Sequence, residues 1–415
     1  MKVLVIGSGE VGTASAWDLV RDSEVEIVGI VGRRKGSLER IRKWMGSDKL
    51  KLHVLDVSNT ADMKTLMKEY DVGIISLPDR KTNYGTVEAA IEARFNVVDI
   101  LEEYHRRPDT YETEGLSTPN QMTLEEYGGW LHRRAMENDV ILLDGLGFAP
   151  GLSNITIGEA IRKMDKAESA IARVGGIPTK EASVKYPLKY MITWAFEHVL
   201  REYMIQVEVI KNGKVVEVPA LSDREEFRFA KLGRHEELEC AVTPGMPSFI
   251  HTRPHLNEFA EKTIRWPGHF EGIDTLKEFG MLDLAPVEFR GMKIAPRDFI
   301  LSVIQPKLKA AEGDTDVCVM QNTVTGTKNG HKMRIDYYMW EEADKENGIS
   351  AMGRVTGFPA AIGAKLIGRG EIDKKGIVAP EDAIEGEVYQ DFMEELTEKN
   401  ITVLEVSETS RLRMR

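Results

Sequence analysis

Hydrophobic residues in the first 150 positions occur in short continuous runs separated by amphipathic segments. The runs lie at 3–6, 25–32, 51–57, 71–78, 96–100 and 139–147. Continuous apolar runs of this length are typical of parallel strands that are buried on both faces. The segments between them have helical patterns, and repeated strand-helix-strand order predicts a doubly wound α/β domain over residues 1–150.

The pattern changes after residue 150. Residues 170–345 alternate short β-type runs with loops, and KNGK at 211–214 and KNGH at 328–331 place Asn-Gly between β-prone segments. Asn-Gly in this setting is a strong hairpin signal. We therefore expect a second, α+β domain with a mostly antiparallel sheet over residues 151–350. The Ala- and Gly-rich stretch 357–370 predicts a helix that packs closely on the first domain, so residues 351–415 are expected to return to it.

The sequence GSGEVG closes the first predicted strand and opens the first predicted helix. In this context Gly7 makes a tight turn, Gly9 lets backbone approach a pyrophosphate, and Gly12 permits close packing of helix on sheet. The helix start, which includes Glu10 and Val11, supplies N–H groups and partial positive charge to the phosphates. The motif predicts a Rossmann dinucleotide-binding domain.

Residues at other strand ends extend the predicted cofactor site. Arg33 and Arg34 follow the second strand with no carboxylate beside them, which favours the 2′-phosphate of NADP, although NAD stays possible. A solvated basic turn is the alternative. A Ser or Asp at the later strand ends either faces the cofactor or caps the next helix. The remaining residues predicted to line the cofactor are Asp56, Val57, Ser76, Leu77 and Pro78.

Composition and charge limit the classes of partner. The 55 basic and 67 acidic residues give a net charge of −12, which argues against nucleic acid or an anionic membrane as the main partner. Cys240 and Cys318 cannot form a disulfide framework and have no metal-ligand spacing, so we expect no metal and a reducing cytoplasm. No apolar run approaches the ~20 residues of a membrane span, and the chain opens directly into a strand.

Two further stretches lie near the end of the first domain. Residues 104–123 have no apolar period and are expected to form a surface loop that borders the cleft, either functional or a plain insertion. The sequence LDGLGFAPGLSNI at 143–155 runs from a strand through a Pro-Gly corner into a helix that Ser153 or Asn154 could cap.

Six short motifs occur in an order that resembles one enzyme family. They are GSGEVG, LDGLGFAPGLSN, RVGGIP, LREY followed by VIKNGKVVEVPALS, KTIRWPGH, and GRVTGFPAAIGAKLIGRG, spread from residue 1 to about 381. Together they resemble the saccharopine dehydrogenase-like oxidoreductases, the group that contains saccharopine reductase and lysine 6-dehydrogenase. The resemblance implies nicotinamide-dependent oxidation at an amine-bearing carbon, or the reverse reductive amination. It also implies a small amino-acid substrate and a homodimer.

Two positions resemble the lysine dehydrogenase arm of this family more closely. Ala149 stands before Pro150-Gly151, where fungal-type saccharopine reductases carry Asp, and Asp79 stands where those enzymes tend to have Tyr. Both differences disfavour saccharopine itself as the substrate. The alternatives are a polyamine enzyme, resembling homospermidine synthase or of carboxynorspermidine type, and a non-catalytic NADP-binding regulator.

An amino-acid substrate brings a carboxylate into a partly buried cleft, where it needs a charged partner. Arg265, set before the Trp266-Pro267-Gly268 corner, is our candidate, because guanidinium binds a carboxylate through two parallel hydrogen bonds. The alternative is a structural ion pair with a nearby acid. His269 is either a second polar contact or a structural histidine. Gly175, Gly176 and Pro178 are expected to make a tight backbone corner that lines the pocket, with Tyr190 and Trp194 as apolar walls or ordinary core.

The reaction also needs a base, which takes a proton from the amine and later activates water against the imine. Glu103 and Asp144, at strand ends, are the preferred candidates, and Asp79 is a third. For each acid taken alone, a structural role is the favoured interpretation. An acid in an apolar cleft would have its pKa raised toward the working pH.

Overall fold

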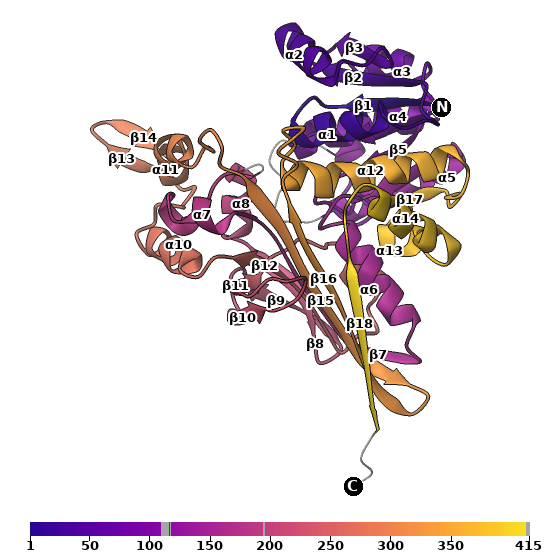
Figure 1. The fold of residues 1–415 in the computed structure, drawn as a ribbon. Helices are drawn as coiled ribbons and strands as arrows, with labels where there is room; N and C mark the ends of the chain where they lie inside the picture. Colours follow the sequence, from indigo (N-terminus) through magenta and orange to yellow (C-terminus); the bar gives the residue numbers. More distant parts are fainter. Residues whose placement is uncertain (109–115, 117, 194–195, 412–415) are drawn as a thin grey trace. The chain divides into compact units, whose positions relative to one another are not determined.

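A computed structural model describes residues 1–108, 116, 118–193 and 196–411 (Figure 1). The chain divides into two compact units, each made of three separate stretches. Unit 1 consists of Met1–Met164, Met246–Arg253 and Gly353–Thr402. Unit 2 consists of Asp165–Gly245, Pro254–Met352 and Val403–Arg415.

Unit 1 is built on a seven-stranded parallel sheet, in the order β17-β6-β5-β4-β1-β2-β3. Residues 3–6 of β1 are fully buried, as expected for a central strand covered on both faces. The order 3-2-1-4-5-6 within this sheet is that of a Rossmann domain, so the predicted doubly wound fold is confirmed. The strands are β1 (Lys2–Ile6), β2 (Ile27–Gly32), β3 (Leu50–Val54), β4 (Val72–Ile75), β5 (Asn96–Asp99), β6 (Ile141–Asp144) and β17 (Gly376–Val378).

The Ala- and Gly-rich helix α12 (Ala351–Gly368) packs on α1 (Glu10–Leu19), as predicted. The Ser15 hydroxyl donates to the backbone oxygen of Gly357 at 3.0 Å, and a Cβ at Gly357 would stand 2.9 Å from the Val11 oxygen. Only glycine permits this approach. The other helices of unit 1 are α2 (Lys35–Met45), α3 (Thr60–Met67), α4 (Arg80–Ala93), α5 (Leu124–Glu137), α6 (Leu152–Arg162), α9 (Phe249–Thr252), α13 (Pro380–Ala383) and α14 (Glu387–Glu398).

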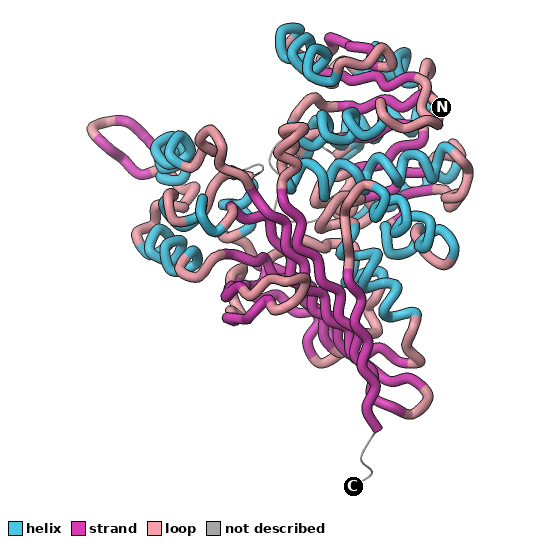
Figure 2. The backbone as a smooth tube through the Cα atoms, in the orientation of Figure 1, coloured by secondary structure: helices cyan, strands magenta, loops and turns pink. Residues whose placement is uncertain are grey.

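Unit 2 contains a nine-stranded, mostly antiparallel sheet, whose long strands are visible in Figure 2. Both predicted Asn-Gly hairpins are present, with positive φ at Asn212 and Gly213 and at Asn329 and Gly330. The pairing of β12 with β7 is parallel. The strands are β7 (Lys166–Pro178), β8 (Gln206–Lys211), β9 (Lys214–Pro219), β10 (Glu225–Phe229), β11 (Glu236–Val242), β12 (Glu258–Arg265), β15 (Asp316–Lys328), β16 (His331–Glu342) and β18 (Leu404–Arg411).

A separate two-stranded sheet, β13 (Val287–Phe289) and β14 (Met292–Ile294), also belongs to unit 2. Aromatic and aliphatic side chains around Tyr190, Tyr203 and Phe270 form a core beneath the short helices of this unit. The helices are α7 (Lys180–Ser183), α8 (Phe196–Glu202), α10 (His269–Glu278) and α11 (Pro296–Ile304).

Gly175, Gly176 and Pro178 do not make the predicted corner, because they lie inside the regular strand β7. A Cβ at Gly175 would stand 2.6 Å from the Ile264 oxygen, and one at Gly176 would stand 2.5 Å from the sulfur of Met352. The two glycines therefore serve close packing around a strand and no turn.

Two other expectations differ from the structure. The start of the 104–123 stretch is no surface loop, since Tyr104 and His105 are buried. Residues 109–115 and 117 of this stretch, and Trp194, lie outside the described residues. The end of the 351–415 segment leaves unit 1, because β18 pairs with β16 in the sheet of unit 2. Within the described part of the chain, no helix is long and apolar enough to cross a membrane.

Candidate functional site

The glycine turn between β1 and α1 has the geometry of a pyrophosphate cradle. Gly7 has a φ of +125°, and a Cβ there would stand 2.1 Å from the Ser76 oxygen at the end of β4. A Cβ at Gly12 would stand 2.3 Å from the Gly7 oxygen. Gly9 is the exposed N-cap of α1, with no atom within 4 Å of where its Cβ would stand and no side chain capping the helix. Glu10 and Val11 form the first turn. This open helix start fits an anionic ligand.

The basic residues after β2 stand at the N-terminus of another helix. Arg33, Arg34 and Lys35 are exposed, and Arg34 is the N-cap of α2, with no side chain capping it. Within the described chain, neither arginine side chain forms a hydrogen bond or ion pair with the protein. Two uncommitted guanidinium groups beside a helix start fit a phosphate monoester, such as the 2′-phosphate of NADP.

The other predicted cofactor residues lie at the ends of β3 and β4. Hydrogen bonds from the Ser58 amide and hydroxyl, at 3.0 and 2.8 Å, lower the pKa of Asp56, and Arg33 adds to this. Asp56 and Ser76 do not cap the next helices, since Asn59 caps α3 and Asp79 caps α4. Asp79 is also the third candidate base, and its carboxylate accepts a hydrogen bond as the N-cap of α4, which gives it a structural role. The half-buried Val57 and Leu77 pack against the core, Ser76 is half-buried and Pro78 is exposed.

A buried polar network lies at the carboxyl ends of β5 and β6, on the edge where ligands bind in doubly wound folds. His105 donates its backbone N–H to Asp144 at 2.7 Å, and its Nδ1 contacts the other Asp144 oxygen at 2.7 Å. The Nε2 of His105 contacts the Asn83 oxygen at 2.6 Å, and the Asn83 amide nitrogen donates to Asp99 at 2.7 Å. All four side chains are fully buried.

These contacts fix the protonation of His105. The Asn83 side-chain nitrogen donates to Asp99, so the Asn83 side-chain oxygen faces Nε2 of His105. This oxygen can only accept, so Nε2 must carry a proton, and Nδ1 donates a second proton to Asp144. His105 is therefore an imidazolium. Burial alone lowers the pKa of His105, but the charges of Asp144 and Asp99 outweigh it and raise the pKa to about 9. Burial also raises the pKa of Asp99 to about 6. The sequence signalled neither His105 nor Asn83, because His105 lies near the start of the polar stretch 104–123 and Asn83 lies within a helix.

The carboxylate of Glu103 is also committed within unit 1. It forms a buried ion pair with Arg80, with contacts of 2.5 and 2.7 Å, and accepts a hydrogen bond from the Tyr84 hydroxyl at 3.1 Å. A carboxylate bound to the fork of an arginine has few free lone pairs. The structure thus holds both preferred base candidates, Glu103 and Asp144, in contacts with buried cations.

In unit 2, Arg265 ends β12 and is buried, with an exposed fraction of 4%. Its Nε donates to the Tyr203 hydroxyl at 3.0 Å, and its Nη1 donates to the Thr263 hydroxyl and the Ile264 oxygen, each at 2.8 Å. The guanidinium also lies over the rings of Tyr190 and Tyr203, at 5.4 and 6.0 Å from their centroids. All these partners are neutral.

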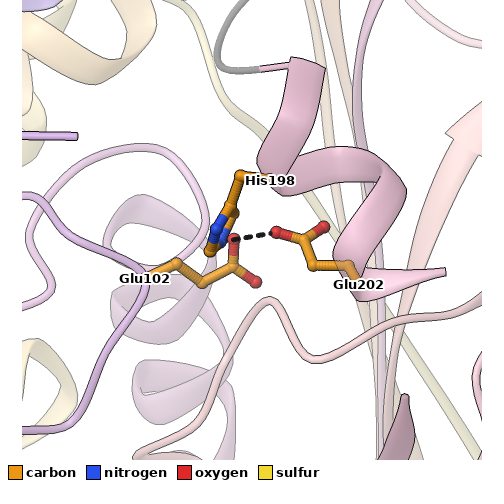
Figure 3. A group of neighbouring side chains, drawn as sticks. All are labelled: Glu102, His198 and Glu202. Atoms are coloured by element: carbon orange, nitrogen blue, oxygen red, sulfur yellow. Dashed lines mark ion pairs between the residues drawn. The ribbon is translucent and has the colours of Figure 1, made fainter. Parts of the chain in front are cut away.

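The acidic residues around Arg265 form hydrogen bonds or ion pairs with other groups. Glu239 lies opposite Arg265 in the β11–β12 register but accepts from the Phe270 amide at 3.0 Å. Glu202 pairs with His198 one turn earlier on α8, at 2.9 Å (Figure 3). Glu261 accepts from Thr243 and the Gly245 amide, and burial raises its pKa to about 8. Among the described residues, none forms an ion pair with Arg265. The structural ion pair considered from the sequence is therefore not observed.

His269 holds the Tyr203 hydroxyl in place. Its Nδ1 contacts the Leu188 backbone oxygen at 2.9 Å and must donate, so its Nε2 accepts from the Tyr203 hydroxyl at 3.2 Å. Burial, aided by the charge of Arg265, lowers the pKa of His269 to about 3. The structural interpretation of His269 is thus favoured over a substrate contact. Tyr203, which the sequence did not signal, links His269 to Arg265.

Tyr190 is fully buried and stacks on Phe196, so its ring is part of the core around α8 and α10. Gly175 lies beside Ile264 on β12, the residue before Arg265. The predicted substrate residues Arg265, His269, Tyr190 and Gly175 are therefore neighbours or near neighbours in unit 2, whereas Gly176 faces Met352 and Thr193.

Comparison with known protein families shows to which family this chain belongs. Residues 3–138 match the model of the saccharopine dehydrogenase NADP binding domain, and residues 147–401 match that of the saccharopine dehydrogenase C-terminal domain. The chain belongs to the saccharopine dehydrogenase family. The resemblance seen in its motifs is confirmed, and the family consists of NAD(P)-dependent dehydrogenases that act on C–N bonds. The chain is accordingly a NAD(P)-binding oxidoreductase of this type.

Three similar proteins whose names state an activity are compared with this chain. The chain is 22% identical to a carboxyaminopropylagmatine dehydrogenase of Synechocystis over 92% of both proteins. It is 24% identical to the mitochondrial alpha-aminoadipic semialdehyde synthase of Bos taurus, covering 96% of this chain but only 47% of that protein. The fold is similar to that of apo saccharopine dehydrogenase (L-Glu forming) from Saccharomyces cerevisiae, with a TM-score of 0.76 and 20% identity, over 98% of this chain and 99% of that one.

Proposed function

We propose that this protein oxidises the C–N bond of a small amine that carries a carboxylate, with NADP as the preferred cofactor. The reaction yields an imine, which water then hydrolyses, or runs in reverse as a reductive amination. The nicotinamide supplies the hydride acceptor. The protein supplies the clamp that holds the substrate and the surface that selects the cofactor.

The observation that carries this proposal is the state of Arg265. A buried guanidinium needs compensation for its lost hydration, and among the described residues the hydrogen-bond partners of Arg265 are all neutral, while the negative charge of Glu202 acts on it without an ion pair. Glu239, Glu202 and Glu261 are engaged with other partners. A carboxylate from the substrate would complete the site through a charge-assisted, bidentate contact and would orient the reacting carbon.

The preference for NADP rests on Arg33 and Arg34. Both side chains are exposed, uncommitted and next to the start of α2, so a 2′-phosphate would meet two cations and helix N–H groups. Asp56, which follows β3 and could bind an NAD ribose, already accepts two hydrogen bonds from Ser58. NAD is the weaker alternative.

The predicted base roles of Glu103 and Asp144 are not retained in this proposal. Glu103 is held by Arg80, and each oxygen of Asp144 accepts a hydrogen bond from His105. His105, as an imidazolium, has no lone pair to accept a proton. These residues are better suited to positioning the ends of β5 and β6.

The first test is a spectrophotometric assay of nicotinamide reduction at alkaline pH. The purified protein is mixed with NADP⁺ or NAD⁺ and with lysine, saccharopine or spermidine, and each carboxylated substrate is compared with a decarboxylated analogue. We expect turnover with a carboxylated amine and NADP⁺, and a loss of at least 100-fold in kcat/KM when the carboxylate is removed.

The Arg265→Met variant is the matched control. It should lose the same factor with the carboxylated substrate but show no further loss with the decarboxylated one, because the two changes remove the same contact. Arg265→Lys should recover part of the affinity, since lysine keeps the charge and loses the fork. Turnover of spermidine alone would refute the carboxylate clamp.

A polyamine-type reaction is the second candidate function. The Synechocystis relative acts, by its name, on a carboxylated derivative of agmatine, which is compatible with a carboxylate held by Arg265. A transferase resembling homospermidine synthase would transfer an aminoalkyl group without accumulation of reduced cofactor. A non-catalytic regulator would bind NADP tightly and turn over none of the amines.

A further inference from the structure

A histidine and a carboxylate of unit 2 lie side by side on α8. His198 and Glu202 are one turn apart, with Nε2 of His198 2.9 Å from Oε1 of Glu202 (Figure 3). Their side chains are 15% and 7% exposed, so both are largely withdrawn from water. A carboxylate beside an imidazole orients the ring and stabilises its charged form, which is the arrangement of many acid–base pairs in enzymes. The pair can therefore take up and release a proton.

The contact between these two side chains is close but poorly aligned. Among the described residues, Oε1 of Glu202 accepts no hydrogen bond of good geometry, although the imidazole is near. The acids around it differ in this respect, since Glu239 accepts from a backbone amide and Glu261 from a hydroxyl and an amide. Catalytic hydrogen bonds are often misaligned before substrate binds and tighten in the complex. Oε1 of Glu202 can accordingly accept from a ligand.

The pair lies beside the carboxylate clamp. Tyr203 directly follows Glu202 in the chain, and its hydroxyl accepts from Nε of Arg265 at 3.0 Å. The negative charge of Glu202 acts on Arg265, on Tyr203 and on Tyr190, whose ring lies under the guanidinium. A substrate whose carboxylate binds Arg265 would thus bring its amine into the region of unit 2 that α8 lines.

The charges of Arg265 and Glu202 match those of an amine that carries a carboxylate. Such a molecule is a zwitterion at neutral pH, with one carboxylate and one ammonium group. Arg265 offers a cation to the carboxylate, and Glu202 offers an anion to the ammonium. Glu261 also interacts with Glu202, but burial raises the pKa of Glu261 to about 8, so at neutral pH it is mostly protonated. Glu202 is then the carboxylate that can balance the substrate ammonium.

We propose that Glu202 binds the substrate ammonium and that the His198–Glu202 pair is the acid–base group of the reaction. This inference rests on the proposed function. The pair takes one proton from the ammonium, because only the neutral amine can release a hydride from its carbon. The C–H bond then breaks, its two electrons leave with the hydrogen to the nicotinamide, and the substrate becomes an iminium.

The same pair serves the hydrolysis. After passing its first proton to solvent, it takes a proton from water as the water oxygen bonds to the iminium carbon. It returns this proton to the nitrogen as the C–N bond breaks. The reaction consumes one water and yields a carbonyl compound, a protonated amine, the reduced cofactor and one proton.

The test measures kcat and KM of His198→Ala and Glu202→Gln with the carboxylated amine that the wild type oxidises. Both variants should lower kcat at least 100-fold, because a positioned acid–base group contributes about 10²–10⁴-fold. Glu202→Gln should also raise KM, since the ammonium loses its counter-charge. Added imidazole should restore at least a tenth of wild-type turnover to His198→Ala, which a purely structural histidine would not allow. The control Glu197→Gln, on the same helix and 58% exposed, should turn over like the wild type.

Thermal unfolding and NADP titration of each variant should match the wild type, which separates a lost proton acceptor from a damaged fold. Turnover within threefold of the wild type in both variants would overturn this inference and leave the proposed function intact. An equal loss in Glu197→Gln would also overturn it, because the effect would then belong to the helix and not to the pair. A wild type that oxidises none of the carboxylated amines would overturn the proposed function, and this inference with it.

Discussion

Raising the pH from 6.5 to 9 should remove about 3 kcal/mol of stability from unit 1 through His105 alone. The pKa of this side chain is about 9 in the folded protein, against 6.5 when it is unperturbed. The difference of about 2.5 pKa units corresponds to roughly 3 kcal/mol at 1.36 kcal/mol per unit. Because His105 is fully buried, solvent does not screen its interactions with Asp144 and Asp99.

The sign follows from the raised pKa. Below pH 6.5, His105 is protonated in both the folded and the unfolded chain, and the stabilising contacts with Asp144 and Asn83 are fully present. As the pH rises toward 9, the unfolded chain loses this proton while the folded chain keeps it, so the free energy of unfolding falls. Glu261 in unit 2, with its pKa raised to about 8, lowers the stability of that unit between about pH 4.5 and 8.

Hydrogen exchange resolved by peptide separates the two units. The protection of β5 and β6, corrected for the intrinsic exchange rate, should fall between pH 6.5 and 9 in the wild type and in Glu261→Gln. In His105→Gln the protection should be lower throughout and should lose this slope. Ring-¹⁵N NMR gives the pKa directly, and His269 serves as the internal contrast, remaining neutral down to about pH 4 because its pKa is about 3. A His105 midpoint near 6.5 would refute the assignment of an imidazolium.

Three further results are expected. Gly9→Ala should leave the fold intact, because its Cβ meets only open space in the protein, and should weaken NADP binding at least tenfold. Gly7→Ala should instead destabilise unit 1, because its Cβ would stand 2.1 Å from the Ser76 oxygen. Calorimetry measures the change in stability, and cofactor titration measures the change in binding. Arg33→Ala with Arg34→Ala should raise the dissociation constant of NADP at least tenfold (about 1.4 kcal/mol) and leave that of NAD unchanged, and an equal loss for both cofactors would contradict a phosphate contact. Tyr203→Phe should lower the free energy of unfolding of unit 2 by about 2–4 kcal/mol, because Arg265 and His269 both lose a hydrogen-bond partner. The same variant should raise KM more than it lowers kcat. An unchanged KM would show that Tyr203 does not support the carboxylate clamp.

The parts of the fold that depend on local pattern could be predicted from the sequence. The central strands β1, β2 and β4 are mainly runs of apolar residues, the hairpins at Asn212 and Asn329 need only positive φ at adjacent positions, and the docking of α12 follows from small residues such as Gly357. Each of these signals is contained within a few residues of chain.

The parts that depend on distant partners could not be predicted. The strand β17 has only three residues and is defined by its pairing with β6, and Gly175 was misassigned to a turn because its true constraint is the Ile264 oxygen on another strand. His105 likewise becomes a charged group only through Asp144 and Asn83, which lie 39 and 22 positions away. Arg265 could be predicted because the residues next to it form an unusual corner. The contacts of Tyr203 and of the acids near Arg265 involve residues far apart in the sequence, so no local pattern reveals them.

The interlaced chain constrains the order in which the protein can form during synthesis. The chain changes units at 164/165, 245/246, 253/254, 352/353 and 402/403, so α12, β17 and α14 of unit 1 emerge from the ribosome only after almost all of unit 2. Until then the sheet edge at β6 and the surface of α1 under α12 stay uncovered. Unit 2, in turn, lacks its last strand β18 until residues 404–411 have been synthesised. Neither unit can mature as a finished piece ahead of the other, and a ribosome that stalls between residues 165 and 352 exposes an incomplete dinucleotide-binding sheet to chaperones and proteases.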